Sequence, residues 1–289
     1  MENLTHHRLY RDHDFDTAFS ELYGIYKRNF WPLFLLSLAG TLLLHLLFYY
    51  VGMQHMDFSG IAAEEFEPPR GFVTNMLMVM LAGLLIYTFL NLAITWFVFR
   101  RQSNRDEPAL NIFGQAAGKY YFRFLLLLIL VSLILIAGIT LGVFALIIGS
   151  LLAAIYLGVS LFVSAPALVI ERIGPGEAVG RSFVLTHRDF WMTLGLAVVL
   201  FLIILLIQFI LTAIVSLPGA VAFISELVST GDVSELIASG QLSGLFGWGL
   251  AGVILNGIVR ALVLPLAPIF AVILYYKLKH QEDALPGKR

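Results

Sequence analysis

The chain of 289 residues is long enough for one or two soluble domains, but its composition excludes that class of protein. Hydrophobic residues make up 59% and charged residues only 13%, which is roughly half the charged share of a soluble domain. A net charge of -1 carries information only through its distribution, and the lack of cysteine excludes disulfides and thiolate chemistry. Apolar runs of about 20 residues recur, each enough to cross a hydrocarbon layer of about 30 Å. The sequence therefore predicts an all-α, polytopic integral membrane protein.

The polar residues 1–13 are predicted to form a mobile N-terminus, ahead of a single membrane domain over residues 14–280. From Asp14, large apolar side chains recur at helical spacing and predict a short amphipathic helix at the membrane–water boundary. A helix packed on the protein's own cytoplasmic face is an alternative that does not exclude the first. The side chains at this spacing are Phe15, Phe19, Leu22, Tyr23, Tyr26 and Phe30.

Six spans with short amphipathic helices on the cytoplasmic side account for the rest of the chain. Residues 124–170 contain no charge, and about 70 Å of continuous helix must fold into two spans, with a turn within residues 142–150. A second short helix is expected over residues 108–121. Pro218 closes the fifth span, short helices are expected near 220–228 and 233–237, and prolines at 265 and 268 interrupt the sixth. The predicted spans are about 31–53, 72–99, 122–145, 149–172, 190–217 and 246–276, followed by a tail over 281–289.

The distribution of basic residues predicts the orientation. Of the 18 Lys and Arg residues, Arg70 lies in a predicted outer loop and Arg260 lies inside a span. All the others fall in the two ends of the chain or in the loops after the second and fourth spans. We therefore expect a multi-pass protein of the plasma (inner) membrane with a cytoplasmic N-terminus and a cytoplasmic C-terminus.

Three segments align with one another and predict an internal repeat. They are AFSELYGIYKRNFW (18–31), IFGQAAGKYYFRFL (112–125) and AVGRSFVLTHRDFW (178–191). In each, a short helix leads through a basic corner to an aromatic residue that opens a span, and the anchors Phe30, Trp31, Phe190 and Trp191 lie at this point. The alternative is that any chain entering a membrane favours basic and aromatic residues at the interface.

The stretch LVIERIGPGEAVGRSFVLTHRDFW resembles the membrane-domain family named after glycerophosphoryl diester phosphodiesterase. The likeness lies in Glu171, the Gly174-Pro175 break, the pair Ala178 and Ser182, and Trp191. The tail PLAPIFAVILYYKLKHQED is similar to the closing span of that family. The resemblance implies a standalone member, because the chain has no room for the phosphodiesterase barrel that some members carry.

Soluble-enzyme motifs do not occur in the sequence, which lacks a phosphate loop, an HExxH motif and a nucleophile elbow. We therefore expect no enzyme activity, no cofactor, no metal and no nucleic-acid partner. His6, His7 and His13 lie in the polar terminus and would make a weak metal site at best.

Polar side chains within the spans form the candidate intramembrane site: Arg260, Asn256, Gln208, Asn91 and His45. Arg260 lies near the middle of its span, where exposure to lipid would cost at least about 2.5 to 3.5 kcal/mol. It should face the bundle interior, a water-filled cleft or a partner. One interpretation is a site for anions or lipid head groups lined by Arg260 and Asn256. The other ties the guanidinium to carbonyls freed by Pro265 and Pro268, or to Gln208.

A second candidate site is the cytoplasmic mouth of the fourth span, with Glu171, Arg172, Arg181 and Ser182. A salt bridge formed by Glu171 and Arg172 is the simplest interpretation. The small residues Gly138, Gly142, Ala145, Gly149 and Ala153 form a stripe that predicts close helix packing. We expect an accessory or membrane-organising module that contacts membrane phospholipid or a protein partner in the membrane. The alternative is a transporter or lipid-handling protein with a polar cleft around Arg260.

Overall fold

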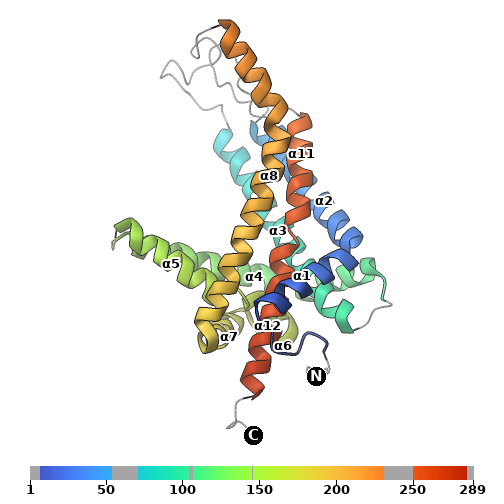
Figure 1. Cartoon of the computed structure of the whole chain (residues 1–289), viewed down its shortest axis with the longest axis vertical. Helices are drawn as coiled ribbons and strands as arrows, with labels where there is room; N and C mark the ends of the chain where they lie inside the picture. The colour runs from blue at the N-terminus through green and yellow to red at the C-terminus, as the bar shows by residue number, and fades with distance from the viewer. Residues whose placement is uncertain (1–6, 54–70, 104–106, 145, 231–249, 285–289) are drawn as a thin grey trace. The chain divides into compact units, whose positions relative to one another are not determined.

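The computed structural model describes residues 7–53, 71–103, 107–144, 146–230 and 250–284, and every regular element in these ranges is helical (Figure 1). The chain is an all-α polytopic membrane protein, as the composition predicted. Within these described ranges, six segments are long and apolar enough to span a membrane: Phe30–Val51, Phe72–Gln102, Ala109–Val143, Ile147–Glu171, Pro175–Val221 and Leu250–Ala284.

The helices follow the chain in a simple order. They are α1 (Phe15–Arg28), α2 (Phe30–Leu47) with the π-helix η2 (Phe48–Met53), α3 (Phe72–Ser103), α4 (Ala109–Val143), α5 (Leu146–Ser160), α6 (Ser164–Glu171), α7 (Pro175–Thr186), the 3₁₀ turn η4 (His187–Asp189), α8 (Phe190–Thr230), α11 (Leu250–Val263) and α12 (Leu266–Ala284). Their contacts define two compact units. The first unit is Met1–Leu33, Thr88–Ile203 and Pro265–Arg289, and the second is Phe34–Tyr87 and Ile204–Leu264.

Helix α12 is the core of the first unit. Every residue from Pro268 to Leu278 is buried, which is the pattern of a helix enclosed on all sides rather than one facing solvent or lipid. Helices α1, α6 and α7 and the turn η4 all contact it (Figure 1). The continuous buried surface of α12 is thus what the surrounding short helices pack against.

The N-terminal residues 7–13 lie against α12, whereas we expected a mobile terminus for residues 1–13. The side chains of Leu9 and His13 are fully buried. The ring of His7 stacks on Tyr276 at 4.1 Å, and the Tyr10 hydroxyl donates to Asp283 at 2.7 Å. Residues 1–6 lie outside the described part of the chain.

Helix α1 begins where Asp14 caps it by accepting the backbone N–H of Thr17. The buried face only partly matches the predicted one: Ala18, Leu22 and Ile25 are buried, while Phe15 and Tyr23 are exposed. The helix packs on α12, which agrees with the alternative of a helix on the protein's own surface.

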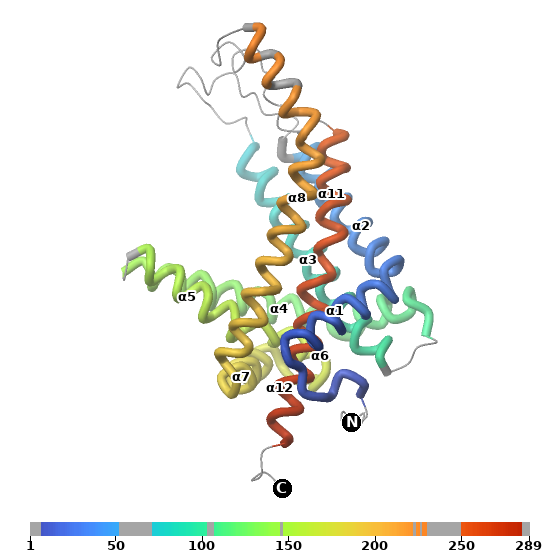
Figure 2. Tube along the Cα trace, viewed as in Figure 1, coloured from blue at the N-terminus to red at the C-terminus, as the bar shows by residue number. Residues whose placement is uncertain are grey.

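Helices α4 and α5 form a tight hairpin, drawn in green in Figure 2. The turn follows Val143, inside the predicted range 142–150. A Cβ on Gly142 would lie 2.7 Å from the backbone of Gly149 and Ser150, so the small-residue stripe does mediate close packing, although Ala145 lies outside the described residues. The separate helix predicted over 108–121 is wrong, because α4 is continuous from Ala109.

Proline determines where two of the spans break. The predicted span 149–172 divides at 161–163, and the sixth divides at Leu264 and Pro265. After each break a new helix begins with a proline in its first turn, where a missing N–H is tolerated. These prolines are Pro166 in α6 and Pro268 in α12. Helix α12 then continues to Ala284, beyond the predicted end at 276 and into the expected tail.

Pro218 does not end the fifth span, contrary to the prediction, because α8 continues through it to Thr230. A proline within a helix removes one hydrogen bond, and membrane helices tolerate that loss when neighbouring groups satisfy the freed carbonyl. The expected helix at 220–228 is therefore the end of α8. The expected helix at 233–237, and most of the acidic outer segments, lie outside the described residues.

In the second unit, α2 and α11 approach each other at Gly257. The Thr41 hydroxyl lies 2.9 Å from the Gly257 carbonyl, and a Cβ on Gly257 would lie 2.8 Å from a methyl group of Leu42. Glycine is thus needed here for close approach, as in many membrane helix pairs.

Candidate functional site

The break between α5 and α6 creates the first part of the site. In a continuous helix the Ser160 carbonyl would accept the N–H of Ser164, but that N–H donates to Leu161 instead, at 3.1 Å. The freed carbonyl accepts the hydroxyl of Ser182 at 2.6 Å, with Thr186 a second donor at 3.4 Å. Ser182 therefore attaches α7 to the break in the neighbouring span, which is a structural role.

The start of α7 follows from its local sequence. Pro175 occupies the first helical position, where its fixed φ suits a helix, and the Glu177 carboxylate accepts the N–H of Gly174 at 3.0 Å. The preceding helix ends at Glu171, after which Arg172 adopts a left-handed conformation with φ of 59°. Arg172 is exposed, and the salt bridge predicted for it is wrong, because Glu171 pairs with Arg181.

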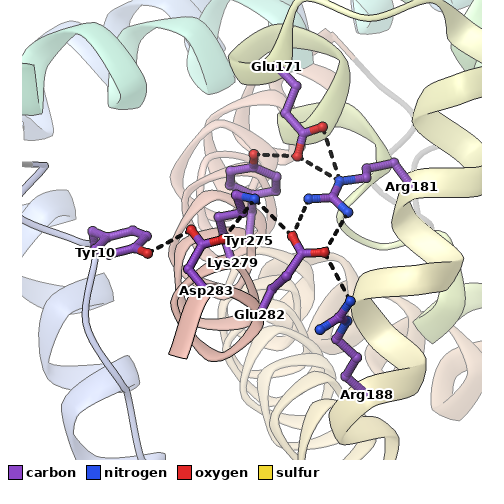
Figure 3. Close-up of polar contacts among 8 residues, drawn as sticks. All are labelled: Tyr10, Glu171, Arg181, Arg188, Tyr275, Lys279, Glu282 and Asp283. Carbon is purple, nitrogen blue, oxygen red and sulfur yellow. Dashed lines mark hydrogen bonds and ion pairs between the residues drawn. The ribbon is translucent and has the colours of Figure 1, made fainter. Parts of the chain in front are cut away.

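Arg181 lies at the centre of a charged cluster between α6, α7 and α12 (Figure 3). Its Nε donates to both oxygens of Glu171, at 2.8 and 3.1 Å. Its two terminal nitrogens donate to the two oxygens of Glu282, one of them at 3.0 Å. This fork of parallel bonds is the strong, geometrically specific form of an ion pair.

Glu282 joins the remaining cations. Its carboxylate also accepts from Arg188 at 3.0 Å and from Lys279 at 2.8 Å, while Lys279 pairs with Asp283 at 3.3 Å. We call this set the corner cluster; it comprises Glu171, Arg181, Arg188, Lys279, Glu282 and Asp283. Three carboxylates oppose three cations, so the corner cluster is neutral.

Further polar contacts of α12 extend the cluster. The buried hydroxyl of Tyr275 donates to Glu171 at 2.8 Å. Lys277, only 2% exposed, pairs with Asp189 at 3.2 Å, which adds one charge of each sign. Every one of these groups is held by another part of the first unit, so what the arrangement does chemically is to pair charges and fix helices.

The N-terminal segment, residues 7–13, carries two groups with a perturbed pKa. Burial, together with the hydrogen bond to Asp283, raises the pKa of Tyr10 to about 12. Burial also lowers the pKa of His13, whose Nε2 lies 3.1 Å from the Leu9 carbonyl. Arg11 pairs with Glu21 of α1 at 2.6 Å, so this segment is fixed to both α1 and α12.

The predicted intramembrane residues divide between the units. Asn91 belongs to the first unit, and His45, Gln208, Asn256 and Arg260 belong to the second. The hydrogen bonds of His45 and Asn256 close within their own helices, to the Thr41 and Gly252 carbonyls. Gln208 is partly buried.

Arg260 is exposed on α11. Of the three surroundings predicted for its side chain, the interior of the bundle is therefore wrong. The Leu264 N–H still donates to the Arg260 carbonyl at 2.9 Å, which shows that α11 stays helical up to the break. An exposed guanidinium within the apolar segment Leu250–Ala284 needs an acceptor from water, lipid or another molecule.

The two Phe–Trp anchors have the same geometry. The rings of Phe30 and Trp31 meet edge to face at 5.4 Å and 73°, and those of Phe190 and Trp191 at 5.7 Å and 75°. Both tryptophans are exposed, at 66% and 80%, as expected for anchors at a membrane interface.

Sequence reasoning missed Glu282, Tyr275 and Thr41. Glu282 lies 101 residues from its partner Arg181, so no spacing rule connects them. A usable signal was present in its position: a carboxylate directly after an apolar span must find a cation if it is buried.

These features define a multi-pass membrane protein whose short helices are locked to a central one. Comparison of the chain with protein-family models, with curated proteins and with solved structures gives no match.

Proposed function

We propose that this protein is an accessory or membrane-organising module, which contacts phospholipid or a protein partner and turns over no substrate. The placement is a plasma (inner) membrane with both ends cytoplasmic, which rests on the distribution of basic residues. The resemblance of residues 168–191 to the glycerophosphoryl diester phosphodiesterase membrane-domain family supports the same assignment, as a standalone member.

The neutral corner cluster is the observation that carries this proposal. A site for an anionic substrate needs cations left without a partner, but Arg181 and Arg188 are already opposed by Glu171 and Glu282. The same contacts fix α7 and the turn η4 to α12. The cluster therefore holds the short helices in fixed positions. A fixed arrangement of helices suits a module that binds lipid or a protein partner through its surface.

The lipid-facing surface also supports a module embedded in the membrane. Large apolar side chains are exposed along α8, a helix long enough to cross the membrane with residues to spare. Because exposed apolar area of this size is stable only in contact with lipid or another protein, contact with one of them is the expected role. Examples are Phe201, Leu202, Leu205, Leu206 and Phe209.

The alternative function is a transporter or lipid-handling protein with a polar cleft around Arg260. The exposure of Arg260 on α11 favours it, because an arginine within an apolar segment is stable only when water or an anionic group reaches it. Asn256 lies one turn earlier on the same helix and would line the same cleft.

Cysteine labelling separates the two functions, and the natural chain contains no cysteine that would give a background. Arg260→Cys is reconstituted in vesicles and treated with a charged, membrane-impermeant methanethiosulfonate. Leu255→Cys, exposed on α11, reports a lipid-facing position. Val259→Cys, 4% exposed, reports a buried one.

An organising module without a cleft predicts that Arg260→Cys reacts as slowly as the two controls, while a membrane-permeant maleimide labels Arg260→Cys and Leu255→Cys. Rapid reaction of Arg260→Cys alone with the charged reagent would mean that water reaches this depth. That result would overturn the organising function in favour of the cleft.

A further inference from the structure

The three aligned segments share a burial pattern, which makes their differences informative. The first aligned position is buried in all three copies, as is the position four residues later. One side of each helix therefore packs inward, and the other side is free to differ. The buried pairs are Ala18 and Leu22, Ile112 and Ala116, and Ala178 and Ser182.

In the first copy, the cations lie at the membrane end of the helix and point outward. Lys27 and Arg28 are exposed in the last turn of α1, and Lys27 lies 5.7 Å over the ring of Tyr23. The Arg28 Nε donates to the Gly24 carbonyl of its own helix at 3.1 Å, so this bond leaves the positive charge of Arg28 without a carboxylate. Trp31, which is 66% exposed, follows directly.

The acidic residues of α1 and of its N-cap do not neutralise those cations. Asp14 and Asp16 lie at the opposite end of α1, about 20 Å away along the axis. Glu21 is held by Arg8 and Arg11 of the N-terminal segment. The membrane end of α1 is therefore left with a net positive charge.

The second copy repeats this arrangement on α4. Lys119, Phe122 and Arg123 are all exposed, and their spacing places them on one face of the helix. Phe122 is 68% exposed, and Lys119 lies 5.6 Å over the ring of Tyr120. Exposed cations beside exposed aromatic rings thus mark two of the three copies.

The third copy differs because its cations are already paired. Arg188 donates to Glu282 of α12, and Arg181 is shared between Glu171 and Glu282. Trp191 is even more exposed than Trp31, yet the charge of the neighbouring Arg188 is already neutralised by Glu282.

We propose that the basic–aromatic surfaces of the first and second copies each bind anionic phospholipid at the membrane interface, with their lysines and arginines on the lipid phosphates and their aromatic rings at head-group depth. The first surface is defined by Tyr23, Lys27, Arg28 and Trp31, and the second by Lys119, Phe122 and Arg123. The inference rests on the proposed function and names the lipid class that it involves. Interfacial aromatic and basic side chains together favour anionic leaflets through apolar burial and charge attraction.

Tryptophan quenching tests the proposal because Trp31 and Trp191 are both largely exposed, at 66% and 80%, but differ in neighbouring charge. The full chain is reconstituted in vesicles that contain brominated phosphatidylglycerol or brominated phosphatidylcholine. Comparing the wild type with Trp31→Phe and Trp191→Phe assigns the quenching to each tryptophan. We expect a several-fold preference for phosphatidylglycerol at Trp31, with about fivefold per cation as the upper bound, and a ratio near one at Trp191.

Two variants of the same residues complete the test. Lys27→Gln with Arg28→Gln should bring the ratio at Trp31 close to one, whereas Lys27→Arg with Arg28→Lys should preserve it. A ratio near one at Trp31 in the wild type, or one unchanged by the loss of both charges, would overturn the proposal. If phosphatidylcholine still quenches both tryptophans in that case, the protein remains embedded and the organising function stands without a lipid preference.

Discussion

The corner cluster predicts a large difference between two neighbouring carboxylates of α12. Glu282 is 7% exposed and opposes Arg181 and Arg188, which are 21% and 24% exposed. Asp283, the next residue, is 43% exposed and pairs with Lys279. Glu282→Gln and Asp283→Asn remove the same charge and almost no volume, so they form a matched pair that differs mainly in burial and in the number of partners.

The expected cost follows from burial. Removing one partner of a fully buried ion pair costs about 3–5 kcal/mol, whereas an exposed pair contributes about 0.2–1 kcal/mol. Because the arginines keep about a fifth of their surface in contact with solvent, we expect Glu282→Gln to lower the free energy of unfolding by about 2–3 kcal/mol, between those limits. We expect Asp283→Asn to cost less than about 1 kcal/mol.

The free energy of unfolding is measured by SDS titration in mixed micelles, with helical circular dichroism as the signal. The double variant Glu282→Gln with Arg181→Gln should cost less than the sum of its single variants, because the first change already removes the contact. Equal effects of Glu282→Gln and Asp283→Asn, or additive effects in the double variant, would refute the conclusion that the ion pairs of the corner cluster hold the helices together.

Three further predictions concern packing, pH and orientation. Gly142→Ala should destabilise the α4–α5 hairpin by about 1–3 kcal/mol, since its Cβ would meet backbone atoms. The control Gly114→Ala, whose Cβ would have nothing within 4 Å, should leave stability unchanged. Equal effects of the two variants in SDS titration would contradict the prediction. Burial lowers the pKa of His13 from its ordinary value of 6.5. As the pH falls, His13 is therefore protonated first in chains whose residues 7–13 have detached from α12, so the packing of this segment should weaken below about pH 6.5. Hydrogen exchange of residues 7–13, corrected for its intrinsic pH dependence, should rise accordingly in the wild type but not in His13→Phe. Reporter fusions within 54–71 should read as outside and fusions at the C-terminus as inside, and a cytoplasmic signal from 54–71 would reverse the orientation.

The sequence predicted the six spans because apolar length is a property of each segment by itself. Helix breaks were less predictable, since a proline acts according to what surrounds it. Pro265 divides the sixth span, whereas Pro218 lies inside a continuous α8. The difference depends on which groups satisfy the freed carbonyl, and that is a tertiary property that the local sequence does not encode.

The candidate site was predictable only in part, for the same reason. Glu171, Arg181 and Ser182 were identified from their position after an apolar run, but their partners come from other helices. Ser182 bonds to a carbonyl that is free only because α5 ends at Ser160. Glu282 was assigned to a tail, although it contacts Arg181 across 101 residues.

The charged residues at the helix ends therefore fall into two groups with different consequences. Where a carboxylate of α12 reaches a cation, as Glu282 reaches Arg188, the charge is used within the protein and the helix is fixed. Where none does, as at Lys27 and Arg28, the cation stays exposed at the membrane end of its helix. The aligned copies offer the same aromatic anchor in both situations, at Trp191 and at Trp31. Since the anchor is common and the neighbouring charge is not, the pairing with α12 is what decides whether the cations of a copy are neutralised within the protein or stay exposed.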